Sequence, residues 1–557
     1  MRTPEAAAAK RLGWILGLSM FSMGICGLSY EYSFSRLATQ ILGDSTKQWA
    51  LVIGVMMLFM GLGADLQKYL GERWLVERFI GLEILLGLVG GLGPALSLYV
   101  FGAAHELFIL VHYLLIATVG LLIGLEIPLM ARVNEACLTR LKDNLGMILK
   151  MDYIGSFVGA LVWVFVLPQF FDFLEIPYLL GLVNLTVALV TLWAFRSFVG
   201  KPWLLALPAL MAIALLGGAM YQGQAIRLHL EQKLFKDPII FSHTSRYQHI
   251  VMTKNRRGEL DTYINGHLQF SSRDEAIYHE FLVHPVMAAS DNPKRVLVMG
   301  GGDGLAVREL LRWPIESVTL VDLDPEMVEL ARTQPELVAL NQGSLRDARV
   351  NDQPAKGVGS GGLQELYLPG QGYFRRSENF GPVEVQALTL DAFEFATSAP
   401  GVFDVIILDF PDPNDPQLSK LYSLEFYQQL RQKLKPGGLM VQQSTSPAFA
   451  LPAFRIIGRT LQAAGWSVAA LHHPVPSFGD WGFWVAGPQE FFGQRGLQQR
   501  LAQINQLPED LKYLTPELIP AAQVFGKNQL DLSQAPVNRL LAERLYQAYQ
   551  QSWARLQ

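Results

Sequence analysis

Seven long apolar runs in the first 221 residues constrain this chain more than any other feature. A run of about 20 apolar residues can cross the hydrocarbon core of a bilayer as a helix. The approximate limits of the runs are Leu12–Tyr30, Trp49–Tyr69, Phe79–Phe101, Leu107–Met130, Met147–Phe170, Ile176–Phe195 and Trp203–Tyr221. Glycine recurs inside them, and small residues allow close helix contact in lipid, so we expect a packed bundle. The first run lacks a convincing cleavage site and is followed by further runs, so we interpret it as a spanning helix and not as a signal peptide.

The charge content separates a membrane region from a globular region. The chain is 50% hydrophobic and only 17% charged, whereas about 25% charged residues are usual in soluble proteins. The deficit lies in residues 1–226, and from Arg227 onward the composition is that of a soluble protein. The net charge of −4 gives no reason to expect a nucleic-acid partner. Cys26 and Cys137 are too few and too far apart to indicate a disulfide framework or a metal site.

Several carboxylates fall in or near the apolar runs. They are Glu31, Asp65, Glu83, Glu126 and Asp152. Carboxylates inside a membrane can mark a transport or ligand site. The alternative is that most of them lie near the ends of the runs or pair with basic neighbours, which are Arg36, Lys68 and Arg132. No repeat or broken-helix pattern is clear enough to indicate a transporter.

A glycine cluster in the globular region predicts a strand, a tight turn and a helix. The apolar run Arg295–Met299 ends in Gly300-Gly301-Gly302-Asp303-Gly304, and a helical pattern follows. Glycines let the backbone approach a nucleotide closely, although such turns also serve tight packing alone. Asp303 would repel a phosphate, so it fits a ligand that carries positive charge.

Later strands in the globular region also end in carboxylates. Asp322 lies about 20 residues beyond the glycine turn, where a carboxylate can hold both ribose hydroxyls. Asp391-Ala392 could recognise an adenine edge, and Asp409 ends a further strand. Polar residues at each strand end, with helices between the strands, predict a doubly wound parallel sheet of the Rossmann-like, methyltransferase type.

These patterns predict four regions. They are a transmembrane helical domain (1–226), a small β-rich part (227–290), a Rossmann-like domain (291–490) with a glycine-rich insert (351–382), and a C-terminal helical extension (491–557). Asn265-Gly266 suits a tight hairpin turn in the β-rich part. The insert is expected to be a surface loop or lid, with a flexible excursion as the alternative.

In this order, the polar segments of the globular region resemble the spermidine synthase (polyamine aminopropyltransferase) family over about residues 240–490. The matching segments are Tyr247-Gln248, Asp274-Glu275, Tyr278-His279-Glu280, Gly300-Gly301-Gly302-Asp303-Gly304, Asp322, Asp391, Asp409-Phe410-Pro411-Asp412-Pro413 and Leu421-Tyr422-Ser423-Leu424-Glu425-Phe426-Tyr427. The membrane region resembles the multi-spanning region fused to some bacterial members, particularly at Tyr30-Glu31 with Arg36 and Gly43.

The resemblance implies transfer of an aminopropyl group from decarboxylated S-adenosylmethionine to putrescine or a related amine, giving spermidine and methylthioadenosine. It implies Asp409 as the general base that takes the proton of the attacking amine. The implied polyamine-binding residues are Tyr278, His279, Asp303, Asp412 and Gln443. The implied nucleoside-binding residues are Gln248, Gly300, Gly302, Asp322, Asp391, Ala392 and Pro416. No cofactor and no metal are expected, because a sulfonium is already a good leaving group.

Two positions depart from the family pattern. Asp391-Ala392 stands where the family often has Asp-Gly, so we expect a slightly altered adenine contact. Phe478 stands where many members have a polyamine-binding tyrosine, which puts the identity of the acceptor amine in doubt.

Two other functions stay open. A methyltransferase that uses S-adenosylmethionine shares the fold and the ribose carboxylate, but it would not need Asp409, Asp412 and Asp303 together. A membrane polyamine transporter or sensor with a degenerate synthase domain is the other alternative. A homo-oligomer is one possible state.

Basic residues at the ends of the apolar runs predict a cytoplasmic N-terminus in a multi-pass protein of the cell (inner) membrane. Lys and Arg collect before the first run and in or beside the second, fourth and sixth connections. The third and fifth connections contain none, although the first has Arg36 and Lys47. Seven crossings then place the globular region outside the cytoplasm, away from a cytosolic nucleoside. Either the number of crossings is wrong by one or the enzyme works on the outer side, and the side of the catalytic domain stays open.

Overall fold

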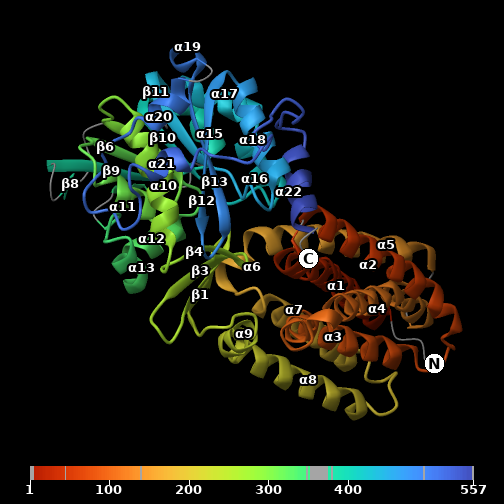
Figure 1. The fold of residues 1–557 in the computed structure, drawn as a ribbon. Helices are drawn as coiled ribbons and strands as arrows, with labels where there is room; N and C mark the ends of the chain where they lie inside the picture. Colours follow the sequence, from red (N-terminus) through yellow and green to blue (C-terminus); the bar gives the residue numbers. More distant parts are fainter. Residues whose placement is uncertain are drawn as a thin grey trace. The chain divides into compact units, whose positions relative to one another are not determined.

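The computed structural model describes residues 6–43, 45–137, 141–346, 349–351, 374–377, 381–493 and 496–554. The chain forms two compact units, Met1–Ile239 and Ile240–Gln557 (Figure 1). The division lies beyond the boundary expected after residue 226, because helix α9 (Gly223–Gln232) continues the helical unit into the segment that we expected to be β-rich.

Within its described residues, the first unit contains seven helices that are long and apolar enough to cross a membrane, as the sequence predicts. The helices of this unit are α1 (Ala6–Leu42), α2 (Ser45–Leu66), α3 (Leu75–Ala103), α4 (Phe108–Cys137), α5 (Leu141–Phe165), α6 (Leu167–Phe170), α7 (Glu175–Ala194), α8 (Trp203–Tyr221) and α9, with the short 3-10 helices η1 (Gln67–Tyr69) and η2 (His105–Leu107). Helix α1 continues well past Tyr30, so Glu31 and Arg36 lie inside a helix and not beyond its end.

Glycines allow these helices to pack closely. A Cβ atom on Gly24 of α1 would overlap the backbone carbonyl of Asp152 on α5. A Cβ atom on Gly124 of α4 would likewise overlap the carbonyl of Met60 on α2. Small residues at these positions therefore permit backbone contact between the helices.

The basic residues Arg36, Lys68 and Arg132 do not all pair with carboxylates of the apolar runs. Lys68 lies 2.6 Å from Asp65, and this pair is exposed. Arg132 binds Glu72 at 2.9 Å, a carboxylate outside the apolar runs. The guanidinium of Arg36 instead lies over two aromatic rings, those of Trp163 and Phe173, with centroid distances of 5.9 and 5.8 Å. Pairing with these bases therefore accounts for Asp65 alone among the five carboxylates.

The second unit opens with a four-stranded sheet in the order β1-β2-β3-β4. Its strands are β1 (Ile239–Thr244), β2 (His249–Lys254), β3 (Leu260–Ile264) and β4 (His267–Ser271). The β3–β4 hairpin turns at Asn265 and Gly266, whose φ angles are +50° and +81°. Two successive positive φ angles are typical of the tight turn that the Asn-Gly pair predicts.

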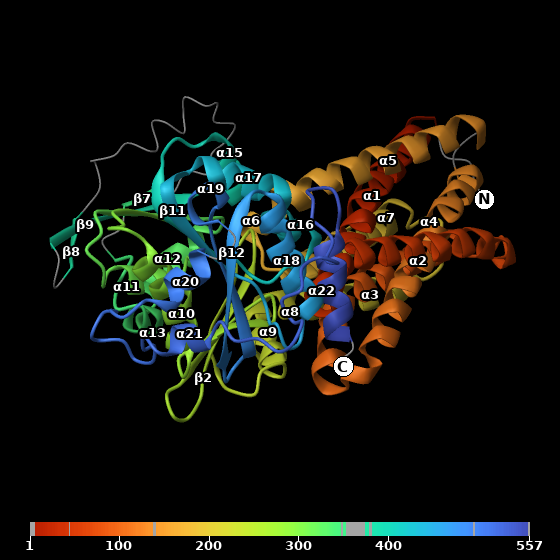
Figure 2. The same cartoon turned by 45° about the horizontal axis from the view of Figure 1, so that its top comes forward.

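A nine-stranded sheet forms the core of the second unit, with the order β12-β13-β11-β10-β5-β6-β9-β7 and β8 paired to β9. Its strands are β5 (Arg295–Gly300), β6 (Ser317–Asp322), β7 (Arg349–Asn351), β8 (Phe374–Ser377), β9 (Gly381–Thr389), β10 (Phe403–Asp409), β11 (Leu434–Gln443), β12 (Trp466–Val475) and β13 (Gly479–Pro488). The strands from β11 to β7 are parallel, and β12, β13 and β8 are antiparallel to their neighbours. Strand β8 lies beside β9 at one end of the sheet (Figure 2).

Helices cover both faces of this sheet. They are α10 (Glu275–Ala289), α11 (Leu305–Leu310), α12 (Pro325–Thr333), α13 (Pro335–Leu340), α15 (Ala392–Ser398), α16 (Pro416–Ser419), η3 (Lys420–Tyr422), α17 (Leu424–Gln432), α18 (Leu451–Ala463), α19 (Gln489–Phe492), α20 (Gly496–Ala502), α21 (Leu518–Ala521) and α22 (Arg544–Ala554). Alternate residues of β5 enter two different cores: Val296 and Val298 pack on one face, Leu297 and Met299 on the other. This alternation confirms the predicted doubly wound fold.

Two predicted regions differ in detail. The extension 491–557 contains only short helices in its described part, because prolines such as Pro508, Pro516 and Pro536 interrupt helix formation. Strands β7 and β8 occupy the described positions in and beside the expected insert 351–382. The glycine-rich residues 352–373, and residues 378–380, lie outside the described residues.

Candidate active site

The carboxyl ends of β5 and β10 meet at the point where the strand order of the sheet reverses. Asp409, the last residue of β10, pairs in register with Gly300, the last residue of β5. Gly300 has a φ of +77°, and a Cβ atom there would overlap the backbone carbonyl of Asp409. Only glycine allows this close approach. Ligands of open α/β sheets bind at such a reversal, so this edge is the candidate site.

Asp322 lies at the same edge, at the end of β6. Its carboxylate accepts the backbone N–H groups of Gly302 and Asp324, both at 2.9 Å. A Cβ atom on Gly302 would lie 2.7 Å from Oδ2 of Asp322, so a larger residue would displace the carboxylate. Burial raises the pKa of Asp322 to about 6. Each oxygen keeps a lone pair for a further donor, so Asp322 is oriented but not saturated.

Gln248 reaches the same edge from the four-stranded sheet. Its side chain hydrogen-bonds with Asp324, which also accepts the Ser245 hydroxyl at 2.7 Å. The structure therefore joins Gln248 to Asp324, two residues after Asp322.

Asp391 caps a helix and also forms an ion pair. Its Oδ1 accepts the N–H of Phe393 at 2.8 Å at the start of α15, next to buried Ala392. Its Oδ2 accepts a hydrogen bond from Lys420 at 2.6 Å. Lys420 begins η3, directly after the helix that Pro416 starts. The ion pair therefore joins the segments that carry Asp391 and Pro416.

Asp409 and Tyr278 form the shortest contact of the acidic part of the site. Oη of Tyr278 donates to Oδ1 of Asp409 at 2.5 Å. Burial raises the pKa of Asp409, while the charge of His279 and the Tyr278 hydrogen bond partly oppose the shift. The charges of His279 and Asp409 also act on Asp303. Burial raises the pKa of Asp303 to about 6, although His279 opposes the shift.

His279 interacts electrostatically with these carboxylates. Its Nδ1 lies 2.8 Å from the backbone oxygen of Glu275 and 3.1 Å from that carboxylate. Burial opposes protonation of His279, but the Glu275 hydrogen bond and the charges of Glu275, Asp303 and Asp409 outweigh it and raise the pKa. His279 is therefore buried, and its contacts with Glu275 fix the position of the imidazole.

A buried ion network supports this part of the site. Arg308 on α11 donates to both carboxylate oxygens of Glu275 on α10, at 2.9 and 2.8 Å. It also donates to Glu309 at 2.7 Å, which lies 3.0 Å from His284. Burial alone would raise the pKa values of Glu275 and Glu309, yet their cationic partners lower both to about 2. The network ties α10, which carries Tyr278, to the helix after the glycine turn.

Asp412 forms a second acidic position with its own donors. Its carboxylate accepts Thr445 Oγ1 at 3.0 Å and Gln443 Nε2 at 3.3 Å. The hydroxyl of Tyr549 on α22 also hydrogen-bonds with it. Burial raises the pKa of Asp412 to about 6, and these three donors oppose the shift. Gln443 also donates to the Tyr422 hydroxyl at 3.0 Å.

Phe478 lies beside the expected polyamine residues. Its ring centroid is 6.3 Å from that of Tyr278 and 5.2 Å from that of Trp481. The preceding Ser477 donates to Asp274 through both its backbone N–H and its hydroxyl. The phenylalanine therefore supplies an apolar wall next to the Asp409–Tyr278 pair.

Sequence reasoning missed three residues that contact the candidate site, which are Lys420, Thr445 and Tyr549. Thr445 follows the end of β11 and has a φ of +58°, a strained value that no local pattern reveals. Tyr549 comes from the C-terminal extension, more than 130 residues after Asp412. No local sequence pattern connects these residues with the carboxylates that they contact.

The carboxylates at this edge are only half-buried, in contrast to Glu275 and Glu309. They concentrate negative charge where a ligand can reach it, which suits a cationic ligand. Within the described ranges, no group of His, Cys, Asp or Glu side chains has the arrangement of a metal site.

Comparison with known proteins extends these observations. A family model described as "Spermine/spermidine synthase domain" matches residues 275–359 and 375–490. A polyamine aminopropyltransferase of Oceanobacillus iheyensis is 35% identical over 557 residues, with 98% of each chain covered. One from Leptospira interrogans is 34% identical over 545 residues, covering 97% of this chain and 99% of the relative. A solved spermidine synthase from Thermotoga maritima is 23% identical, covers 53% of this chain and 87% of its own, and has a TM-score of 0.39.

The two curated matches run through the helical unit as well as the sheet unit, since each covers almost the whole of both chains. The order of carboxylates at the sheet edge and these full-length matches lead to one assignment. The chain belongs to the polyamine aminopropyltransferase (spermidine synthase) family.

Proposed function

We propose that this enzyme transfers the aminopropyl group of decarboxylated S-adenosylmethionine to putrescine or a related amine. The observation that carries the proposal is the convergence of Asp303, Asp409 and Asp412 with Tyr278 at one sheet edge. Donor and acceptor are both cations, so carboxylates stabilise both where a phosphate site would need lysines. We expect no metal and no cofactor in this reaction.

In the proposed reaction, the neutral amine of the acceptor attacks the aminopropyl carbon next to the sulfonium. A C–N bond forms while the C–S bond breaks, and its electron pair neutralises the sulfur to give methylthioadenosine. Asp409 takes the proton that the amine must lose, because a protonated amine has no lone pair. The Tyr278 hydrogen bond fixes the oxygen of Asp409, and the raised pKa suits a proton acceptor near neutral pH.

Two groups of residues would hold the substrates. Asp322 and Gln248, with Gly300 and Gly302 allowing close approach, would bind the ribose side of the donor. The adenine would lie toward Asp391, Ala392 and Pro416, where Lys420 competes for one carboxylate oxygen. Asp303 and Asp412 would bind ammonium groups, with His279 and Gln443 holding their surroundings in place.

Intact S-adenosylmethionine is a poorer donor for this site on electrostatic grounds. Its α-carboxylate would face the half-buried carboxylates that attract the decarboxylated donor, and like charges in a confined site repel. This argument favours aminopropyl transfer over methyl transfer.

The test uses the purified full-length protein in detergent. Decarboxylated S-adenosylmethionine and putrescine are supplied, and methylthioadenosine and spermidine are measured. We expect equal amounts of the two products. Methyl transfer from intact S-adenosylmethionine would support a methyltransferase, and binding of amine without turnover would support a sensor or transporter. Either result would contradict the proposal.

We further propose that the helical unit inserts in the cell (inner) membrane as a multi-pass domain. Its seven apolar helices support this, and an odd number of crossings would put the two chain ends on opposite sides. A reporter fused after Gln557 that is active only outside the cytoplasm is expected to give signal. A signal from a cytoplasmic reporter would instead show that one helix does not cross.

A further inference from the structure

Two carboxyl groups in the interior of the helical unit have buried oxygens without hydrogen-bond partners among the described residues. Glu83 on α3 is 0% exposed and Glu126 on α4 is 3% exposed. Among the described residues, neither oxygen of Glu83 and not Oε1 of Glu126 receives a hydrogen bond. The two side chains are nevertheless within hydrogen-bonding reach of one another. Two carboxylates can only accept, so this contact needs a proton or another cation between them.

Two further unpartnered polar side chains contact α3, the helix that carries Glu83. Tyr30 of α1 and Asn184 of α7 are both 0% exposed, and neither the Tyr30 hydroxyl nor either amide atom of Asn184 has a partner in the described structure. Tyr30 packs against Gly90 of α3, and Asn184 packs against Gly87. Glu83 lies one helical turn before Gly87, on the same face of α3.

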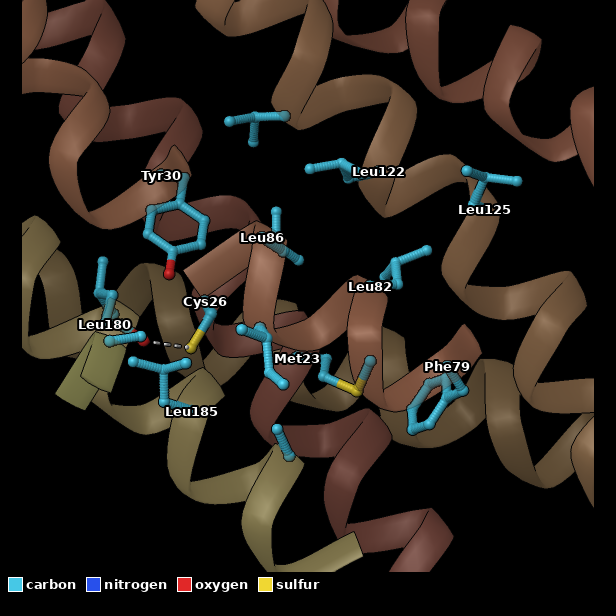
Figure 3. Close-up of a cluster of buried hydrophobic side chains, with 14 of the residues drawn as sticks. Met23, Cys26, Tyr30, Phe79, Leu82, Leu86, Leu122, Leu125, Leu180 and Leu185 are labelled. Carbon is cyan, nitrogen blue, oxygen red and sulfur yellow. Dashed lines mark hydrogen bonds between the residues drawn. The ribbon is translucent and has the colours of Figure 1, made fainter. Parts of the chain in front are cut away.

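Electrostatics links this position to α1. The Tyr30 hydroxyl and the Cys26 thiol both interact with the charges of Glu83 and Glu126. In Figure 3 the Tyr30 hydroxyl points toward Cys26, whose thiol donates to the carbonyl of Leu180 on α7 at 3.6 Å. The leucines around them come from α3, α4 and α7 (Figure 3). Polar groups from four helices therefore converge inside an apolar core.

Such a cluster is costly without a ligand. A carboxylate in an apolar interior loses its hydration, and an unpaired buried polar atom loses a hydrogen bond as well. Two carboxyls that share one proton carry a single net negative charge, and one monovalent cation can take the place of the shared proton without changing that net charge. The acceptors present are carboxylate oxygens, an amide oxygen and a hydroxyl, which together match the three N–H donors of a primary ammonium group.

We propose that Glu83 and Glu126, with Tyr30 and Asn184, form a binding site for one alkylammonium group inside the helical unit. The choice of an amine over another monovalent cation rests on the proposed function of the sheet unit. Binding exchanges the shared proton for the ammonium group, so one proton leaves for each amine bound. The site is separate from the carboxylates at the sheet edge, which belong to the other compact unit.

The test is labelling of the full-length protein in lipid nanodiscs with dicyclohexylcarbodiimide, which adds to protonated carboxyl groups in apolar surroundings. Mass spectrometry identifies the modified peptides. We expect label on Glu83 or Glu126, and we expect spermidine at ten times its Kd to suppress it about tenfold, because that concentration fills about 90% of the sites. Equal concentrations of butane-1,4-diol and of sodium chloride serve as controls and are expected to give no protection.

Two variants make the result specific. Asp409→Asn is expected to show the same protection, and Glu83→Gln is expected to lose protection of Glu126. Asp65, an exposed carboxylate outside the apolar interior, is labelled in parallel as a control and is expected to show no protection by spermidine. Protection that disappears in Asp409→Asn would assign the effect to the sheet unit and overturn the inference. Absence of label without amine, labelling that spermidine does not change, or equal protection by sodium would overturn it too.

Spermidine synthesis measured on the same samples keeps the two proposals apart. Synthesis without protection would contradict only the membrane site. Protection without synthesis would contradict only the proposed reaction of the sheet unit.

Discussion

The buried carboxylates of the two compact units differ in their hydrogen-bond and ionic partners. In the sheet unit, Glu275 and Glu309 bind arginines and histidines, and Glu280 accepts three backbone N–H groups from residues 512–514. In the helical unit, neither oxygen of Glu83 and not Oε1 of Glu126 has a hydrogen-bond partner among the described residues. A buried carboxylate with every partner present supports the fold. One without partners is the better candidate for a site that a ligand completes.

A third group of carboxylates lies between these extremes. Asp303, Asp409 and Asp412 are half-buried, hold only a few donors each and have raised pKa values. Partial burial strengthens their attraction for a cation while leaving them accessible. The comparison thus separates carboxylates that have ionic partners within the fold from carboxylates to which the proposed function assigns substrate binding.

Removal of Arg308 is expected to give the largest loss of stability. Arg308→Met leaves Glu275 buried with His279 as its main remaining cationic partner and takes one partner from Glu309. We expect the free energy of unfolding to fall by about 3–5 kcal/mol. Chemical denaturation followed by circular dichroism measures this value. The control Arg332→Met removes an exposed partner of Glu329 and is expected to change it by less than about 0.5 kcal/mol. Equal effects of the two variants would contradict the structural role of the network.

As the pH falls, Asp303 and Asp412 are expected to lose their negative charge before Glu275 and Glu309 do. The raised pKa values of Asp303 and Asp412, both about 6, mean that these groups lose their charge as pH falls through 6. Glu275 and Glu309, with pKa values of about 2, keep theirs. We expect kcat/KM for putrescine to fall about tenfold or more for each pH unit below 6, while the fold persists. A rate that stays level down to pH 4.5 would contradict this assignment.

The Tyr549 hydroxyl is expected to have a smaller effect, confined to the acceptor. Tyr549→Phe removes one donor to Asp412 and leaves the packing of α22 intact. Loss of one hydrogen bond corresponds to about 0.5–1.5 kcal/mol, so KM for putrescine should rise about threefold to tenfold with little change in kcat. Tyr546→Phe alters the same helix at a hydroxyl that is not a partner of Asp412. An equal rise in both variants would mean that the helix, and not the hydroxyl, sets the affinity.

Replacement of an unpartnered carboxyl is expected to give the smallest change in stability. Glu126→Gln substitutes a neutral group of similar size for a carboxyl whose Oε1 has no hydrogen-bond partner among the described residues. We expect the free energy of unfolding in detergent to change by less than about 1 kcal/mol, or to rise. A loss as large as that of Arg308→Met would show that Glu126 has structural partners and would remove the contrast between the units.

Local sequence patterns predict the elements of both units better than their contacts. Seven apolar runs are enough to predict seven long helices, because a bilayer demands length and hydrophobicity from each helix separately. The Asn265-Gly266 turn and the strands that end in Asp322 and Asp409 follow from equally local rules. The carboxyl ends of parallel strands share one edge, so the candidate acidic site could also be predicted.

Contacts between distant segments could not be predicted in this way. The approach of Glu83 to Glu126 depends on how α3 and α4 rotate against each other, and hydropathy does not encode that rotation. The Asp391–Lys420 pair and the Tyr549 contact join segments that no periodic pattern connects. Both contacts depend on how side chains from distant segments pack in three dimensions.

The central claim is that a half-buried carboxylate at the sheet edge performs the chemistry. The most direct measurement compares aminopropyl transfer by Asp409→Asn and by the control Asp404→Asn, using purified full-length protein. Asp404 lies on the same strand and binds Lys294, Arg295 and Lys435 near its start, so its loss should affect stability and not turnover. We predict that Asp409→Asn lowers kcat about 10²–10⁴-fold while unfolding stays close to that of the wild type. Activity of Asp409→Asn within tenfold of the wild type would contradict the account.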